Sequence, residues 1–510
     1  MTAAPPPSGE PQPSPPVPGM GTRTAALLVF GSSAAVLVIE ITALRLLAPY
    51  LGLTLETSTL VIGIALTAIA IGSWAGGQFA DRSDPRRLIA PSLGVSGAVV
   101  AITPAMVRTT AEWAQPILLL VASLTILVPG ALLSAVTPMV TKLRLTALAK
   151  TGTVVGSLSG VGTIGAITGT VLTGFVLISR VPVSGILVGL GALLVVGSLV
   201  VEWRMRVWRR ASAAAVAGIV VLGGLAGLVA PGGCDAETQY HCARVIGDPE
   251  RAGGRTLVLD GIRHSYVDVD DPTTLTFAYV RAIAAAVDSA FPPKEPLAAY
   301  HLGGGGMTYA RYLAATRPGS HSVVSEIDGG VVGLDRERLG LTPDGGIDVR
   351  VEDGRLGLRE LSARSRDVVV GDAFGGVSVP WHLTTREAIG DVRRVLKDDG
   401  VYVANLIDYG ALAFLRAETA TLAETFDHVV LAGEPRDVGV DPSAAPNGGN
   451  FVVIASDRPI EPRRLRDALR QRETQWTTIS GADLADWIGD AQVLTDDHAP
   501  VDQLAEPNRP

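Results

Sequence analysis

Long apolar segments alternate with short polar ones over the first 230 residues. Each apolar segment is about as long as the roughly twenty residues that a helix needs to cross the hydrocarbon core of a bilayer. The pattern predicts seven helices, near residues 25–47, 57–80, 88–107, 116–138, 152–178, 183–201 and 211–230. We therefore expect an all-α transmembrane bundle over residues 21–232, with the lipid bilayer as its partner.

The segment 152–178 differs from the others in its regular glycines. They stand at positions 152, 156, 160, 165 and 169. Small residues four positions apart let two helices approach closely in lipid. This spacing predicts that the helix is packed inside the bundle.

From residue 233 onward the pattern changes to that of a globular protein. Residues 242–270 alternate apolar and polar positions between glycine turns, which predicts a small antiparallel sheet, and a helix is expected over 273–290. Residues 233–292 would form this first part, and residues 293–510 a second part in which strands and helices alternate. Strands are expected at 297–302, 321–327, 347–351, 366–371, 400–406, 427–432 and 449–456.

This alternation is typical of a parallel, doubly wound α/β sheet. The last two strands follow each other without a convincing helix between them, so they should form a hairpin. A parallel sheet that ends in a hairpin is the layout of the S-adenosylmethionine-methyltransferase-like (Rossmann-like) fold.

Composition and net charge give further predictions about the N-terminal tail and about the partners of the protein. Residues 1–20 are rich in Pro, Ser and Gly, which predicts a disordered tail. The net charge is −8, and the acidic excess lies in the second half, so no nucleic-acid partner is expected.

Basic residues in the short loops predict the orientation of the bundle. They gather in the loops 81–87, 141–150 and 202–210, which places these loops and the N-terminus in the cytoplasm. With seven crossings, the C-terminal domain would lie outside the cell. Cys234 and Cys242 would then face an oxidising space and could form a local disulfide, the alternative being two unpaired thiols.

A glycine cluster, Gly303 to Gly306, follows the expected strand 297–302. The backbone of Gly303, Gly304 and Gly305 could approach a ligand closely and open a helix N-terminus toward it. Glu326 follows one βα unit later, at the spacing of an acid that binds ribose hydroxyls. Thr308 and Tyr309 stand where a dinucleotide fingerprint has its third glycine, which favours a smaller adenosine ligand.

Further acids follow the next strands at the edge where such sheets bind ligands. Asp328 stands beside Glu326, Asp353 precedes Gly354, and Asp372 ends a later strand. Asp353 is placed to accept a hydrogen bond from an adenine amino group. Asp372 is placed as a base or as an anchor for an amine. The alternative for each acid is that it caps a helix.

Several segments of this half match motifs of one family. They are Leu259-Asp-Gly-Ile-Arg-His-Ser265, His301-Leu-Gly-Gly-Gly305, Ser325-Glu-Ile-Asp328, Val351-Glu-Asp-Gly354, Asp367-Val-Val-Val-Gly-Asp372, His382-Leu-Thr-Thr-Arg-Glu387 and Leu494-Thr-Asp-Asp-His-Ala-Pro-Val-Asp502. In these segments the chain resembles the spermidine synthase (polyamine aminopropyltransferase) family, and as a whole it resembles bacterial members fused to a multi-pass membrane region.

The resemblance implies a transferase of polyamine biosynthesis. Its co-substrate would be decarboxylated S-adenosylmethionine or S-adenosylmethionine, without a metal. Its acceptor would be a small amine similar to putrescine, and the protein could be a homodimer. The resemblance implies that Glu326 binds the ribose, that Asp353 binds the adenine, and that Asp372 belongs to the catalytic loop.

The chain departs from the family where cationic amines are bound. Gly306 and Gly375 each replace an aspartate, and Tyr279-Val-Arg281 stands in place of Tyr-His-Glu. A doubly charged diamine is costly to desolvate without carboxylates around it. A methyltransferase-like enzyme and a non-catalytic transporter or sensor that binds a ligand therefore remain as alternatives.

Overall fold

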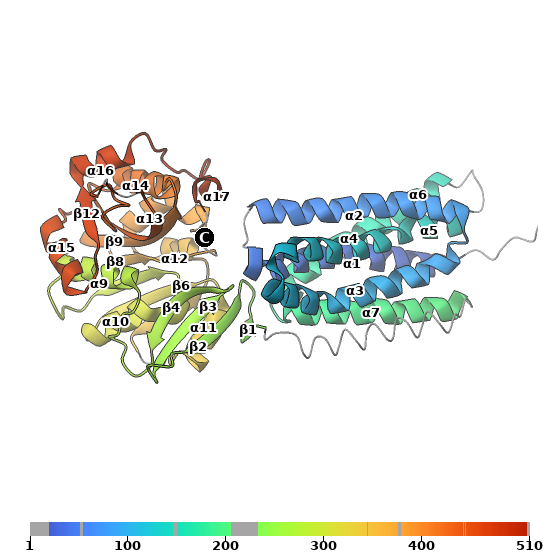
Figure 1. The fold of residues 1–510 in the computed structure, drawn as a ribbon, viewed down its shortest axis with the longest axis horizontal. Helices are drawn as coiled ribbons and strands as arrows, with labels where there is room; N and C mark the ends of the chain where they lie inside the picture. The colour runs from blue at the N-terminus through green and yellow to red at the C-terminus, as the bar shows by residue number, and fades with distance from the viewer. Residues whose placement is uncertain are drawn as a thin grey trace, which may run out of the picture. The chain divides into compact units, whose positions relative to one another are not determined.

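The structure is a computed structural model that describes residues 20–51, 55–145, 151–205, 233–343, 345–375, 379–441, 443 and 445–506. The chain forms two compact units, which are drawn in Figure 1. The first comprises Met1–Leu46 with Thr59–Pro231, and the second comprises Leu47–Ser58 with Gly232–Pro510.

The first unit is made of helices. They are α1 (Thr22–Leu51), α2 (Leu55–Arg82), α3 (Arg86–Trp113), α4 (Leu118–Ser134), α5 (Val136–Arg144), α6 (Thr151–Leu172) and α7 (Val183–Met205). Six segments of the described chain, with α4 and α5 counted as one, are long and apolar enough to cross a membrane. The predicted helix at 211–230 lies outside the described residues.

Glycines bring three pairs of these helices into backbone contact. A Cβ atom on Gly72 of α2 would lie 2.1 Å from the Ala131 carbonyl oxygen of α4, and one on Gly97 of α3 would lie 2.6 Å from that of Gly191 of α7. A Cβ on Gly165 of α6 would lie 2.3 Å from the Phe30 carbonyl oxygen of α1. These approaches are too close for any side chain, so only glycine fits there.

The prediction that the glycine-rich helix 152–178 is packed inside the bundle is wrong for most of its surface. Only 22% of its apolar span is buried, against 67% for α3. Gly165 and Gly169 contact α1, whereas Gly152, Gly156 and Gly160 have no neighbour within 4 Å of an added Cβ among the described residues. A regular glycine spacing marks one close contact here, and it does not bury the whole helix.

The second unit begins with the small antiparallel sheet that the alternation predicted. Its strands are β1 (Ala236–Glu237), β2 (Cys242–Gly247), β3 (Gly254–Leu259) and β4 (Ile262–Asp268), in that order. A disulfide joins Cys234 to Cys242, which confirms the predicted local bond.

An eight-stranded sheet follows, with the order β12-β10-β11-β9-β8-β5-β6-β7. Its strands are β5 (Ala298–Leu302), β6 (His321–Glu326), β7 (Ile347–Val351), β8 (Arg366–Gly371), β9 (Leu396–Tyr409), β10 (His428–Gly433), β11 (Gly448–Ser456) and β12 (Thr477–Ser480). The strands β5 to β9 pair in parallel, and β11 inserts antiparallel between β9 and β10. The predicted parallel sheet with a terminal hairpin is thus confirmed, while β12 was not predicted.

Helices cover both faces of this sheet (Figure 1). One face packs against α9 (Ala278–Ala290), α10 (Thr308–Thr316) and α15 (Pro462–Gln471). The other packs against α12 (Gly354–Glu360), α13 (Arg386–Val395), α14 (Ala413–Thr425), α16 (Gly481–Ile488) and α17 (Val501–Leu504). Adjacent strand residues alternate between the two cores, as Ala299 and Tyr300 do, because successive side chains of a strand point to opposite faces. The remaining helix, α11 (Gly329–Glu337), packs against the small sheet.

Candidate nucleoside-binding site

A cavity of about 780 Å³ opens where the carboxyl ends of β5, β6 and β8 meet. Its size is in the range of small-molecule sites. Gly303, Gly304 and Gly305 line it, together with Glu326, Asp353 with Gly354, and Asp372. All but one of the residues predicted from the sequence therefore lie around one cavity; the exception is Asp328.

The glycine loop runs directly against the end of β8. Gly303 has a φ of +90°, and a Cβ atom there would lie 2.4 Å from the Asp372 carbonyl oxygen. The Asp372 amide in turn donates to the Leu302 carbonyl. A Cβ on Gly304 would lie 2.6 Å from a methyl group of Val324. Glycine is thus required at position 303, whereas a side chain at position 304 would force Val324 and Met307 to shift. The close approach at Gly303 brings Asp372 beside the loop.

Glu326 faces this loop. Its Oε2 accepts a hydrogen bond from the Gly304 amide at 2.8 Å, and its Oε1 accepts from the Asp328 amide at 2.9 Å. Burial raises the pKa of Glu326, and these two hydrogen bonds offset part of that rise. The carboxylate is held at the cavity wall, where its remaining lone pairs could accept from ribose hydroxyls.

Asp328 has a different place from the one predicted. It is fully buried as the N-cap of α11, where its Oδ1 accepts from the Gly330 amide at 2.9 Å. Its Oδ2 accepts from the Thr238 hydroxyl. Asp328 does not line the cavity, so for this acid the helix-cap alternative holds.

Asp353 combines both of the roles considered for it. Its Oδ1 caps α12 by accepting from the amides of Arg355 and Leu356, each at 3.0 Å. Its Oδ2 lies 2.8 Å from the His382 Nε2, and both side chains line the cavity. Burial alone would raise the pKa of Asp353, but the hydrogen bonds from Leu356, His382 and Arg355 outweigh burial and lower it. The carboxylate is therefore kept ionised as an acceptor.

Asp372 is held by side chains. Its Oδ1 accepts from the Asn405 amide at 2.8 Å, and the Asn405 Oδ1 accepts from the Asn450 amide at 3.0 Å. The Tyr279 side chain also lines the cavity, and its hydroxyl donates to the His264 carbonyl at 3.1 Å. Burial raises the pKa of Asp372 to about 6, although the hydrogen bond from Asn405 and the neighbouring Tyr279 hydroxyl act to lower it. This carboxyl can therefore exchange a proton near neutral pH.

We name the two ends of the cavity by these groups. The nucleoside end comprises Gly303–Gly305, Glu326 and Asp353. The Asp372 end comprises Asp372 with Tyr279, Asn405 and Asn450.

The prediction from sequence did not include several residues that line the cavity. They include His241, His264, His382, Asn405, Glu434, Asp437 and Asn450. Glu434 and Asp437 follow β10, whose carboxyl end lies at the same edge of the sheet as that of β8. The rule that acids follow strand ends could have found Glu434. The two asparagines lie inside strands, where no such rule applies.

Gly306 does not leave room for the aspartate that the family carries. It has a φ of +75°, and a Cβ atom there would lie 2.3 Å from the Ser265 hydroxyl oxygen. The Gly306 amide donates to the Asp335 carboxylate at 3.1 Å. The local backbone is thus built for glycine, so the departure from the family is part of the fold.

The chain is 28% identical over 253 residues to the polyamine aminopropyltransferase of Vibrio vulnificus, covering 47% of this chain and 79% of that protein. It is 30% identical over 141 residues to the enzyme of the same name from Chromobacterium violaceum, covering 28% of this chain and 53% of that protein. No family model matches the chain.

Among solved structures, a probable spermidine synthase from Corynebacterium glutamicum is 26% identical, with a TM-score of 0.48. That similarity covers 54% of this chain and 99% of the other. The curated relatives support the assignment of the C-terminal part of this chain to the spermidine synthase family.

Proposed function

We propose that the C-terminal unit is an aminopropyltransferase-like enzyme that transfers an aminopropyl group from decarboxylated S-adenosylmethionine to an amine. The observation that carries this proposal is the position of Glu326. Its carboxylate is hydrogen-bonded to the Gly304 amide, at the wall of the cavity that Asp372 also lines. One ligand in this cavity could therefore donate its ribose hydroxyls to Glu326 and place its reacting group near the titratable Asp372.

The chemistry follows from these two groups. With the adenosyl moiety at the nucleoside end, the sulfonium would lie toward Asp372. The lone pair of a neutral amine attacks the methylene carbon of the aminopropyl group that is bonded to the sulfur. A C–N bond forms, and the bond from this carbon to the sulfur breaks. Its electron pair neutralises the sulfonium and leaves methylthioadenosine. The new ammonium group gives its proton to the Asp372 carboxylate, which passes it to solvent.

A second candidate is a methyltransferase-like enzyme with a different acceptor. The arrangement at the Asp372 end favours it, since the carboxylate there is supported by the neutral amides of Asn405 and Asn450. Glu434 and Asp437 line the same cavity, but the Glu434 carboxylate already accepts from Arg436 at 2.7 Å, and the Asp437 carboxylate accepts from the amides of Asn447 and Gly448. A dication would therefore find few uncommitted carboxylates, whereas a monoamine would need only one.

Calorimetry on the full-length protein in detergent tests the donor assignment. The ligands are S-adenosylmethionine, its decarboxylated form and methylthioadenosine. We expect binding of the decarboxylated form and of methylthioadenosine, followed by release of methylthioadenosine when putrescine is added. Transfer from S-adenosylmethionine alone would favour the methyltransferase candidate. Binding without turnover of any donor would leave a sensor or transporter, and binding of none would exclude every nucleoside function.

The proposal includes a membrane-spanning first unit. Six segments have the length and hydropathy for it, and the apolar sequence 211–230 would add a seventh. With seven crossings and a cytoplasmic N-terminus, the second unit lies outside, which agrees with the Cys234–Cys242 disulfide. S-adenosyl donors are cytoplasmic, so they would then have to reach the cavity across the membrane.

Labelling of intact cells decides the side of the membrane. An impermeant maleimide, applied after an impermeant reductant, should modify Cys234 and Cys242 if the second unit is outside. Labelling only after the cells are lysed would place the unit in the cytoplasm.

A further inference from the structure

An ion pair between a buried arginine and a partly exposed aspartate links the first turn of α12 to the C-terminal segment. Both terminal nitrogens of Arg355 donate to Asp496, each to a different carboxylate oxygen at 2.8 Å. The Arg355 side chain is only 9% exposed. Such a two-fold pairing fixes the plane of the guanidinium as well as its position.

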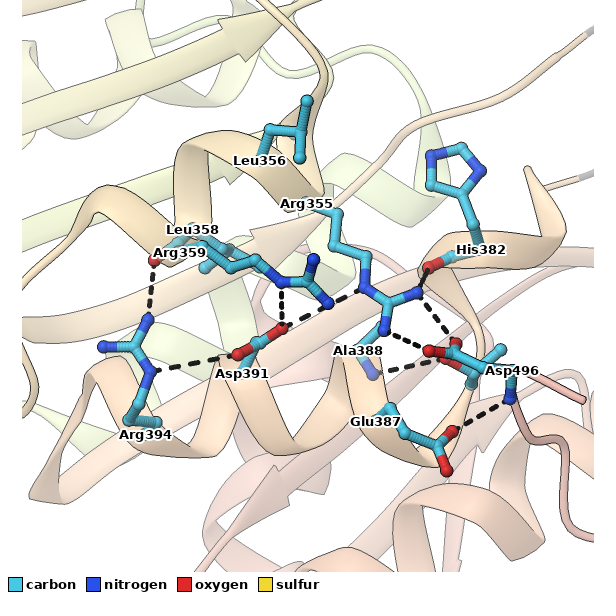
Figure 2. Close-up of polar contacts among 12 residues, drawn as sticks. Arg355, Leu356, Leu358, Arg359, His382, Glu387, Ala388, Asp391, Arg394 and Asp496 are labelled. Carbon is cyan, nitrogen blue, oxygen red and sulfur yellow. Dashed lines mark hydrogen bonds and ion pairs between the residues drawn. The ribbon is translucent and has the colours of Figure 1, made fainter.

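The same pair also holds the segment that carries His382. Arg355 donates a further hydrogen bond to the His382 carbonyl at 3.0 Å, and the Thr385 hydroxyl donates to Asp496 at 2.7 Å. The Asp496 amide donates to Glu387 at 3.0 Å. Figure 2 shows the Arg355 guanidinium between Asp496 and the His382 carbonyl, while the His382 imidazole points away from the ion pair.

The imidazole of His382 reaches the nucleoside end of the cavity. Its Nε2 lies 2.8 Å from the Asp353 Oδ2, and the Asp353 Oδ1 is held by the amides that begin α12. Two amides on one oxygen and an imidazole on the other fix the rotation of this carboxylate. His382 is thus fixed at its carbonyl by Arg355 and contacts Asp353 through its ring.

We propose that Arg355 and Asp496 are positioning residues that set the base selectivity of the nucleoside end by holding His382 against Asp353. This inference rests on the proposed function, because it assumes a nucleoside in the cavity. A fixed, ionised carboxylate accepts from the 6-amino group of adenine and repels the 6-oxo group of hypoxanthine. A carboxylate that is free to rotate, or to exchange its proton, discriminates less between the two.

The alternative is that the ion pair only fastens the C-terminal segment to the fold. Loss of the pair would then weaken the binding of every nucleoside by the same factor. The ratio of two affinities separates these roles, because a general loosening of the cavity cancels in the ratio.

The test measures binding of 5′-methylthioadenosine and 5′-methylthioinosine to the full-length protein. Asp496→Asn should lower the ratio of the two affinities by roughly five- to tenfold. His382→Ala should lower the ratio by a similar factor, and the double variant should add little to either, because both act through the same carboxylate. Arg355→Lys keeps the charge but loses the paired geometry, and it gives the same readout should Asp496→Asn fail to fold.

Arg359→Gln is the matched control. Arg359 lies on the same helix and pairs with Asp391 at 3.1 Å, but its side chain is half exposed, and among the described residues it forms no hydrogen bond with His382 (Figure 2). It should leave the ratio unchanged.

Two results would overturn the inference. If Asp496→Asn and Arg355→Lys weaken both nucleosides equally, the pair has only a structural role. If His382→Ala leaves the ratio intact, His382 does not act on Asp353. Failure of the unaltered protein to bind either nucleoside would instead refute the proposed function itself.

Discussion

The two ends of the cavity hold their acids in different ways. At the nucleoside end, Glu326 and Asp353 each accept hydrogen bonds from backbone amides. At the other end, the side chain of Asp372 accepts from the side chain of Asn405, which in turn accepts from that of Asn450. The backbone therefore supports Glu326 and Asp353, whereas side chains that could be exchanged support Asp372.

This difference indicates which part of the site can change without loss of the fold. Removal of Glu326 or Asp353 would leave loop or helix amides without partners, so these acids are tied to the structure. The surroundings of Asp372 can vary with little effect on the backbone. Under the proposed function, recognition of the donor would therefore depend on acids tied to the backbone, and recognition of the acceptor on side chains that can be exchanged.

Replacing Asp372 should have the strongest effect of all, and it should affect turnover much more than nucleoside binding. Asp372→Asn should reduce turnover by about 10²- to 10⁴-fold, because the variant has no carboxylate to take the proton from the acceptor. The affinity for methylthioadenosine should change by less than about threefold, since this nucleoside does not reach the acid. Single-turnover kinetics and calorimetry measure the two quantities. Asp398→Asn, an exposed acid outside the cavity, serves as the control. Equal losses in both quantities would erase the distinction between the two ends.

The next effect concerns donor affinity. Glu326→Gln should weaken methylthioadenosine binding by about 1.5–3 kcal/mol, the value of hydrogen bonds to a charged group. Isothermal calorimetry gives this loss directly. The matched control is Glu352→Gln, since Glu352 accepts from the Ser325 hydroxyl at 2.8 Å but does not line the cavity. An unchanged affinity in Glu326→Gln would show that no ribose lies against this acid.

Restoring an acid at position 306 tests whether the glycine loop can be returned to the family pattern. Gly306→Asp should destabilise the protein by at least about 1–2 kcal/mol, because a side chain is strained at positive φ and would collide with Ser265. It should not increase activity with putrescine. Thermal unfolding and a turnover assay measure these outcomes. Gly305→Ala is the stability control, since its Cβ would meet only an ordinary contact at 3.5 Å. A stable variant with higher putrescine turnover would contradict this prediction.

The smallest effect is a shift in pH dependence. Burial raises the pKa of Asp372 to about 6, and the ionised form is the base. The contribution of Asp372 to the single-turnover rate should therefore fall about tenfold per pH unit below about 6. Above that pH the rate should follow the neutral fraction of the acceptor amine, whose pKa is about 10. Asn405→Ala should move the midpoint upward, because its hydrogen bond lowers this pKa. A midpoint that stays in place, or moves downward, would exclude Asp372 as the titrating group.

Most strands of the second unit were predictable from local pattern. Apolar runs of five or six residues between turns predicted β5 to β8 within a residue or two. The strand β12, which has four residues, was not predicted because a short segment has too little periodicity to be recognised. The strand β9 is longer than predicted for a different reason, because its polar first residues do not fit an apolar run.

The candidate site was only partly predictable. The spacing of glycines and acids was enough to find Gly303–Gly305, Glu326, Asp353 and Asp372, because parallel strands bring their carboxyl ends to one edge. The same rule also selected Asp328, which caps α11. A helix cap and a ligand contact use the same residue types at the same strand end, so the sequence could not separate them.

By itself, the sequence determined the two-part organisation, the order of the sheet-forming segments and the residue types at the cavity edge, because hydropathy period and turn chemistry are local properties. Three contacts could be found only in the folded protein: Asn405 and Asn450 support Asp372, Arg355 pairs with Asp496, and α6 contacts α1 through one short stretch. Those contacts join residues far apart in the chain, and their geometry depends on how whole elements pack, which no local pattern records.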